Sequence, residues 1–147
     1  MLKGIPAIIS PELLKVLDEM GHSDVLVIGD SNFAAKSLAS VNNHINIRLD
    51  GNGAVDVLDN VLKLFPIDTF VDKPVGIMKK MDIHKDLDCL IHKKFEDVVA
   101  KYDSRGKECV EYVDRFEFYE RAKKAYAIIS TTETEPYACI MLQKGCV

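Results

Sequence analysis

Short apolar runs typical of buried strands alternate along this chain with stretches whose apolar residues follow helical spacing. The run 25–28 is continuously apolar and bounded by polar residues, as in a strand covered on both faces. In the segment before it, apolar residues recur every three or four positions, as on one helix face: Leu13, Leu14, Leu17 and Met20. This alternation predicts a layered α/β fold around a mostly parallel central sheet.

The predicted elements fill the chain without an obvious break. A helix is expected from the N-cap Ser10 to a left-handed stop at Gly21. Further helices are predicted over 33–38, 55–65, 95–102 and 116–124, and strands over 25–28, 45–49, 74–81, 125–130 and 137–142. The polar turn 131–136 between the last two strands predicts a C-terminal β-hairpin. No linker divides the sequence, so one domain is expected over 1–147.

Composition excludes several classes of function. With 19 Lys and Arg against 23 Asp and Glu, the net charge of −4 argues against nucleic acid or anionic membrane as a partner. No apolar run approaches the ~20 residues of a membrane span, and the first residues lack the pattern of a secretory signal. The four cysteines form no C-x-x-C pair, which argues against a zinc ribbon or a disulfide framework. We therefore expect a cytoplasmic protein with reduced thiols and no metal site.

Two motif-like segments carry little chemistry. Ser31, in Ile28-Gly29-Asp30-Ser31, resembles the opening block of GDS-type serine hydrolases, but no Asp-x-x-His supplies the base that such a nucleophile needs. Ser31 is better interpreted as a turn or capping residue. Gly51 and Gly53 form neither G-x-G-x-x-G nor a P-loop, and both are expected to be loop glycines with positive φ.

The histidines divide into two groups. His44, His84 and His92 lie at irregular spacing in polar stretches and are expected on the surface. His22 lies in a tight loop between a helix and a strand, where a neutral imidazole can exchange a proton near pH 7. The alternative interpretation is a histidine satisfied within its loop.

The segment 115–122 combines charged and aromatic residues. Arg115 and Tyr119 lie four residues apart and share a helix face, where they suit binding of hydroxyl groups, with the aromatic ring covering the apolar face of a sugar. Tyr137 could serve similarly. The alternative is a helix packed by its aromatic residues, with its charges in solvent.

Several segments share their order and spacing with one known family. They are 2–6, 9–14, Met20-Gly21-His22, Asp30-Ser31-Asn32-Phe33, Arg48-Leu49-Asp50-Gly51, Arg115-Phe116-Glu117-Phe118-Tyr119-Glu120-Arg121-Ala122 and Lys144-Gly145. Together they resemble the ribose/fucose mutarotase family, and the segment from Arg115 is similar to its fucose branch.

That resemblance implies an isomerase that interconverts the α and β anomers of L-fucose without a cofactor, as a cytoplasmic homodecameric ring. It implies that His22 is the proton donor and that Asp30, Arg115 and Tyr137-Ala138-Cys139 contact the sugar. The family usually has Tyr-Gly-Asn at the last place. A thiol is a weaker donor and acceptor than an amide, so this difference weakens a side-chain contact from Cys139 but leaves a backbone contact unaffected, and the sequence does not decide between them.

The chemistry needs one group to take the proton of the anomeric hydroxyl and another to protonate the ring oxygen. His22 is the expected acid, while Asp30 and a tyrosine near Arg115 remain alternatives for the second group. Up to ~26 Å of extended chain separates His22 from Asp30, which predicts a site shared between subunits. Two other functions stay open, a non-catalytic sugar-binding module and a purely structural subunit.

Overall fold

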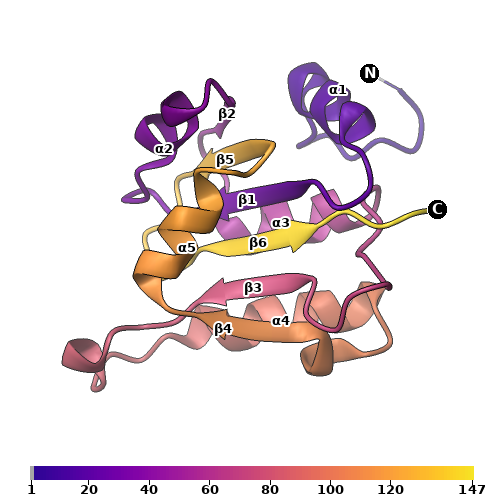
Figure 1. The fold of residues 1–147 in the computed structure, drawn as a ribbon. Coiled ribbons are helices and arrows are strands. Elements are labelled where there is room, and N and C mark those ends of the chain that lie inside the picture. Colours follow the sequence, from indigo (N-terminus) through magenta and orange to yellow (C-terminus); the bar gives the residue numbers. More distant parts are fainter. Residues whose placement is uncertain (1) are drawn as a thin grey trace.

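Within residues 2–147, which the computed structural model describes, six strands form one sheet in the order β2-β5-β1-β6-β3-β4 (Figure 1). Five strands run parallel, while β6 runs antiparallel to its neighbours β1 and β3. The strands are β1 (Val25–Gly29), β2 (Ile45–Leu49), β3 (Val75–Met78), β4 (Val110–Val113), β5 (Ala127–Thr131) and β6 (Ile140–Gln143). The predicted α/β class with a mostly parallel sheet is confirmed.

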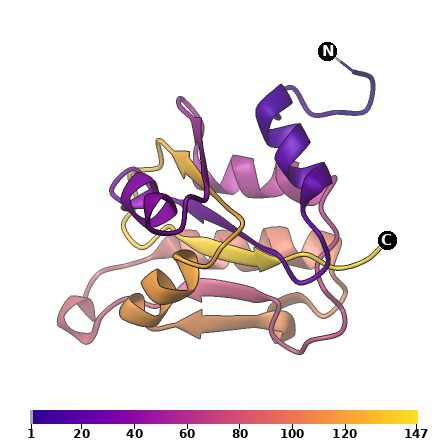
Figure 2. The ribbon, with the colours of Figure 1, turned by 45° about the horizontal axis from the view of Figure 1, so that its top comes forward.

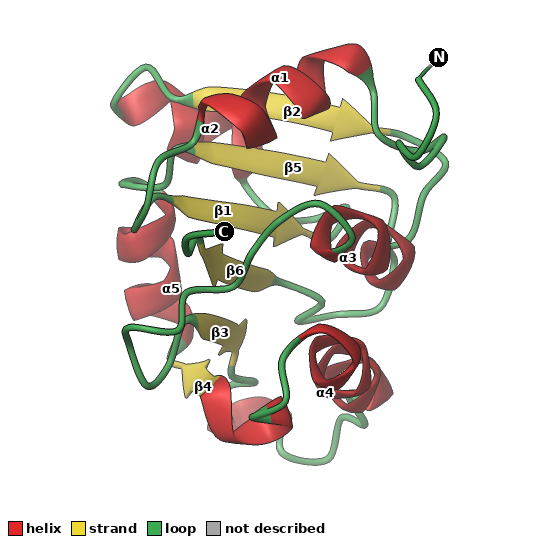
Figure 3. Cartoon of the chain, turned by 90° about the vertical axis from the view of Figure 1, so that its right-hand side faces the viewer, coloured by secondary structure: helices red, strands yellow, loops and turns green. Residues whose placement is uncertain are grey.

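Helices cover both faces of the sheet (Figures 2 and 3). One face carries α1 (Pro11–Glu19), α3 (Ala54–Leu62) and α4 (Leu90–Tyr102), and the other carries α2 (Ala35–Val41) and α5 (Arg115–Ala122). Two short 3₁₀ helices, η1 (Asp82–His84) and η2 (Gly106–Cys109), lie in connections. In the described part of the chain, no helix has the length and apolar character that crossing a membrane requires.

The continuous apolar run in β1 follows from this layering. Successive side chains of a strand point to opposite faces. Leu26 and Ile28 pack with α1, α3 and α4, whereas Val27 packs with α2 and α5. Both faces of β1 are therefore buried, and polar residues are absent from both.

The start of α1 is as predicted and its end is not. The Ser10 side chain accepts a hydrogen bond from the backbone N–H of Leu13 at 3.1 Å. The helix ends at Glu19, and Ser23 rather than Gly21 has a positive φ, of 73°. The predicted left-handed residue at Gly21 is therefore wrong. The Gly21 N–H donates to the Asp24 carboxylate at 2.8 Å, and this contact is made with the left-handed residue two positions later, at Ser23.

The predicted C-terminal β-hairpin is also wrong. β5 and β6 do run in opposite directions, but β1 lies between them and pairs with both. Eight residues, 132–139, join the two strands, and tight hairpin loops have two to five. The apolar run of β1 takes the central position because it can be buried on both faces.

Two smaller expectations also differ. Gly51 has the expected positive φ, of 81°, but Gly53 is extended with φ −78° because it is the N-cap of α3. The edge strand β4 was not predicted, since it has four residues and two of them are polar or exposed.

The topology separates the predicted site residues between two edges of the sheet. Asp30 follows β1 and Arg115 follows β4, so both lie at the edge formed by the carboxyl ends of the parallel strands. Cys139 directly precedes the antiparallel β6 and therefore lies at this same carboxyl edge. His22 precedes β1 and lies at the opposite, amino edge. In open α/β sheets the carboxyl edge is where ligands usually bind.

Candidate functional site

A pocket of about 360 Å³ opens at the carboxyl edge of the sheet. It brings together five of the predicted sugar-contacting residues, which come from the residue after β1, from α5 and from the connection between β5 and β6. The residues that line it are Asp30, Asn32, Phe33, Met78, Met81, His84, Arg115, Tyr119, Pro136, Tyr137 and Cys139. We call it the carboxyl-edge pocket. Carboxylate, guanidinium and phenol groups around one hollow suit a small molecule that carries several hydroxyls.

Asp30 is held at the inner end of this pocket. Its carboxylate accepts hydrogen bonds from the backbone N–H of Asn32 at 2.9 Å and from the Cys139 thiol at 3.4 Å. Burial, together with the nearby Asp30 charge, raises the pKa of Cys139 well above its ordinary value. The thiol therefore keeps its proton and acts as a donor that orients the carboxylate.

The other two residues of the predicted sugar-binding triplet lie differently. The Ala138 side chain is fully buried against the α1, α3 and α4 face of the core and does not line the pocket, so a contact from Ala138 would use its backbone. Tyr137 is half-buried and does line it.

Arg115 and Tyr119 form one wall of the pocket. Arg115 and Tyr119 share a helix face, as their four-residue spacing predicted, and the Arg115 guanidinium lies over the Tyr119 ring, 5.2 Å from its centroid. The Phe33 ring lies 5.2 Å from the Tyr119 ring on the inner side. This aromatic stack fixes the phenol and keeps the guanidinium beside the hollow.

Tyr137 is the most constrained residue of the pocket. Its φ of 60° places a non-glycine residue in the left-handed region, which costs of the order of 1 kcal/mol or more. The His92 ring nitrogen Nε2 lies 3.1 Å from the Tyr137 carbonyl oxygen, and because a carbonyl only accepts, Nε2 carries the proton. Burial lowers the pKa of His92, in keeping with a neutral donor. The expectation that His92 lies on the surface was wrong.

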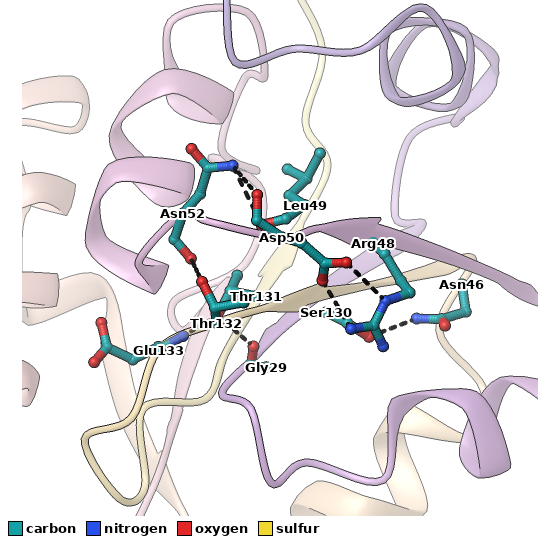
Figure 4. A network of polar contacts seen from close by, with 10 residues as sticks. All are labelled: Gly29, Asn46, Arg48, Leu49, Asp50, Asn52, Ser130, Thr131, Thr132 and Glu133. Atoms are coloured by element: carbon teal, nitrogen blue, oxygen red, sulfur yellow. Dashed lines mark hydrogen bonds and ion pairs between the residues drawn. The ribbon is translucent and has the colours of Figure 1, made fainter.

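The loop before Tyr137 is anchored to both helices behind it. The Glu133 carboxylate accepts the N–H of Ala54 at the start of α3 at 3.3 Å, and the Glu135 carboxylate accepts the N–H of Ile91 at the start of α4 at 2.7 Å. A carboxylate at a helix N-terminus is favoured by the helix dipole. At the end of β5, Thr131 Oγ1 donates to the Gly29 carbonyl at 2.8 Å (Figure 4).

His22 belongs to a second cluster at the amino edge. Its Nε2 lies 3.1 Å from a carboxylate oxygen of Asp68, which also accepts from the Gln143 amide at 2.9 Å. The His22 side chain is 40% exposed, whereas that of Asp68 is 1% exposed. The Phe70 ring packs edge-on against the imidazole, with 5.2 Å between centroids.

Asp68 is an ionised partner for this imidazole. Burial acts to raise the pKa of Asp68, but the hydrogen bonds from the Phe70 N–H and from Gln143 and the charge of His22 together lower it. An ionised carboxylate only accepts, so it holds the proton on His22 Nε2 and stabilises the imidazolium. Nothing in the sequence singles out Asp68, since it lies 46 residues from His22.

The structure therefore brings together Asp30, Arg115, Tyr119, Tyr137 and Cys139 but leaves His22 apart. β1 lies between the two clusters, and its five residues span roughly 13 Å at ~3.3 Å per step. Sequence reasoning missed Asp68, Met81 and His84, which the folded chain brings next to the predicted residues.

Fold and site together define a small α/β protein with a polar pocket at the carboxyl edge of its sheet, and comparison with known proteins shows its family. The chain belongs to the RbsD / FucU transport protein family, whose model matches residues 3–147. The resemblance drawn from the sequence is confirmed.

The named relatives cover nearly the whole chain. The human protein named fucose mutarotase is 42% identical to this chain, in an alignment that covers 98% of this chain and 93% of the human protein. The crystal structure of FucU from Bifidobacterium longum matches with a TM-score of 0.93 and 45% identity, over 99% of both chains. The fucose mutarotase from Streptococcus pneumoniae, solved in complex with L-fucose, matches with a TM-score of 0.89 and 40% identity, over 99% of both chains.

Proposed function

We propose that this protein is an isomerase that interconverts the α and β anomers of L-fucose. Its similarity to fucose mutarotases extends over nearly the whole chain, and one of these was solved with L-fucose bound. The observation that carries the proposal is the carboxyl-edge pocket, in which Asp30, Arg115, Tyr119 and Tyr137 surround a hollow of about 360 Å³. These groups offer charge-assisted hydrogen bonds to hydroxyls and aromatic surface to an apolar sugar face.

The reaction opens and recloses the pyranose ring. One group takes the proton of the anomeric hydroxyl while an acid protonates the ring oxygen, and the open aldehyde then rotates and recloses. His22 is the acid in this scheme. Asp68 on Nε2 stabilises the imidazolium and leaves Nδ1 as the nitrogen that exchanges its proton with the sugar. Asp30 binds a sugar hydroxyl from the opposite side.

The complete site is shared between two copies of the chain. His22 and the carboxyl-edge pocket lie at opposite edges of one sheet, so one subunit does not present both to one sugar. A ring in which the amino edge of one subunit faces the carboxyl edge of the next would complete the site. We propose that the decameric ring implied by the sequence resemblance is arranged in this way and is the active form.

Cytoplasmic location is part of the same proposal. Cys89, Cys109, Cys139 and Cys146 are all unpaired, and Cys139 needs its thiol proton to hold Asp30. A reducing compartment preserves that contact.

Exchange NMR of the anomeric protons tests the proposed function. L-fucose with the purified protein should show α–β exchange faster than in buffer alone, and D-ribose and D-galactose serve as comparison sugars. Retained binding of L-fucose with no faster exchange would instead indicate a non-catalytic sugar-binding module. If the protein neither binds L-fucose nor speeds its exchange, the remaining alternative is a structural subunit.

A further inference from the structure

His84 and Tyr137 form a pair at the mouth of the carboxyl-edge pocket. The His84 Nδ1 atom lies 2.5 Å from the Tyr137 hydroxyl oxygen, and the two rings meet edge to face. The residues are 53 positions apart, on η1 and on the loop before β6. His84 is exposed, as the sequence predicted, but its ring lines the same hollow as Asp30 and Arg115.

Both halves of the pair are held in place by other contacts. Tyr137 is fixed by its left-handed backbone and by the His92 hydrogen bond to its carbonyl. On the other side, the Lys80 ammonium donates to the carbonyls of Lys85 and Leu87, at 2.8 and 2.7 Å, and closes the segment that carries η1 into a compact loop. This loop extends past the end of β3, at the lower left of Figure 1.

The chemistry of the pair is directional. A neutral imidazole whose Nδ1 is unprotonated accepts the phenol proton, and Nε2 then carries the ring proton. Histidine is the side chain suited to taking and returning a proton near neutral pH. A phenol backed by such an acceptor can take a proton from a sugar hydroxyl while it passes its own proton on.

We propose that His84 is the positioning residue and proton acceptor behind Tyr137, and that this pair is the second proton-transfer group of the anomer exchange. The inference rests on the proposed function and deepens it. Tyr137 contacts the anomeric hydroxyl, and His84 acts through Tyr137.

The ring-opening step balances as follows. The anomeric O–H proton moves to the Tyr137 oxygen, and the Tyr137 proton moves to His84 Nδ1. The electron pair of the anomeric O–H bond becomes the second bond of the C1 carbonyl, and the bond from C1 to the ring oxygen breaks. The ring oxygen keeps that pair and takes a proton from His22. Ring closure reverses each transfer, so both histidines return to their starting states.

This role predicts a particular pH dependence. When His84 is protonated by solvent it no longer accepts from Tyr137, so exchange should slow on the acid side. Other charged or titratable groups lie near the pair, and the variants must separate their effects. Those that line the same pocket are Asp30, Arg115, Tyr119 and Cys139, and those on the His84 loop are Lys80, Asp82, Lys85 and Asp86.

The test compares four variants with the wild-type protein: His84→Gln, His84→Ala, Tyr137→Phe and, as a control, His44→Gln. His44 is half-buried between α2 and β2 and does not line the carboxyl-edge pocket. Exchange NMR gives kcat and KM for L-fucose from pH 5 to 9. In parallel, ¹⁵N-edited NMR of the imidazole nitrogens reports the His84 hydrogen bond without any need for activity.

A glutamine carbonyl can accept the phenol hydrogen bond but cannot take its proton. We expect His84→Gln to lower kcat by about 10²-fold or more, to keep KM near the wild-type value and to lose the slowing of exchange at acid pH. The control His44→Gln should have the kcat, KM and pH profile of the wild-type protein. The His84 Nδ1 resonance should shift in Tyr137→Phe. Wild-type kcat and wild-type slowing at acid pH in His84→Gln would overturn the inference, as would a changed KM with unchanged kcat or an unshifted Nδ1 in Tyr137→Phe. A wild-type protein without L-fucose exchange would instead contradict the proposed function, and the Nδ1 measurement would still decide whether the pair exists.

Discussion

The Cys139 thiol donates to the Asp30 carboxylate across 3.4 Å, in a place where both side chains are buried. The thiol thus acts as a hydrogen-bond donor, although cysteine in a protein core usually behaves as a small apolar residue. To donate a hydrogen bond to the sugar, the Cys139 thiol would have to leave Asp30, and its sulfur is only a weak acceptor. The backbone-contact interpretation is therefore the one that this geometry supports.

The first prediction follows from that contact. Cys139→Ser keeps a donor for Asp30, whereas Cys139→Ala leaves a buried carboxylate oxygen without one. We expect the alanine variant to have a free energy of unfolding about 1–3 kcal/mol below that of the serine variant, measured by urea denaturation. Cys146→Ala, at an exposed cysteine, is the control and should match the wild-type protein. Equal stability of the serine and alanine variants would show that the contact contributes nothing.

Arg115 should matter more for binding than the Cys139 side chain. Arg115→Ala removes a charged donor that lines the pocket, and charge-assisted hydrogen bonds contribute about 1.5–3 kcal/mol. Calorimetric titration with L-fucose should show affinity weakened by roughly 10- to 100-fold, against little change in Cys139→Ser. The reverse order of effects would contradict the backbone-contact interpretation of Cys139.

His22→Ala should fold normally, because the side chain is 40% exposed and belongs to a loop. We expect it to lose most of its acceleration of L-fucose anomer exchange, by about 10²–10⁴-fold, as for removal of a general acid. Exchange NMR measures the rate, and circular dichroism checks the fold. A wild-type rate in this variant would remove His22 from the mechanism.

The separation of His22 from Asp30 leads to a mixing experiment. Inactive His22→Ala and Asp30→Ala proteins are unfolded, combined and reassembled. If sites are shared, part of the wild-type exchange rate should return, because some interfaces then carry both intact groups. Mass spectrometry verifies that mixed rings form. Mixed rings without recovered activity would place both residues in the site of one subunit.

Asp68 should make stability depend on acid pH. Its folded-state pKa lies below its ordinary value, so the stabilisation is complete above the unfolded pKa of about 3.9 and is lost as pH falls through the folded pKa. Urea denaturation below about pH 4 should therefore show a shallower loss of stability in Asp68→Asn than in the wild-type protein. Asp72→Asn, at an exposed aspartate, should keep the wild-type slope. The same slope in both variants would mean that Asp68 is not the titrating group.

Local patterns in the sequence were sufficient for the elements and for part of the site. The apolar run of β1 predicted a strand buried on both faces, and Ser10 marked the start of α1. The four-residue spacing of Arg115 and Tyr119 placed both on one face of α5, where the guanidinium does stack on the ring. Each of these features depends on residues that are close together in the sequence, so the sequence pattern alone predicts it.

Strand order and the partners of distant residues were decided by the tertiary structure. Two strands joined by a turn predicted a hairpin, yet β1 lies between them, because pairing is set by which strand can be buried on both faces of the whole sheet. His22 meets Asp68 and Tyr137 meets His84 across 46 and 53 positions. No local pattern records such pairs, since they form only when the sheet brings loops that are distant in sequence together at one of its edges.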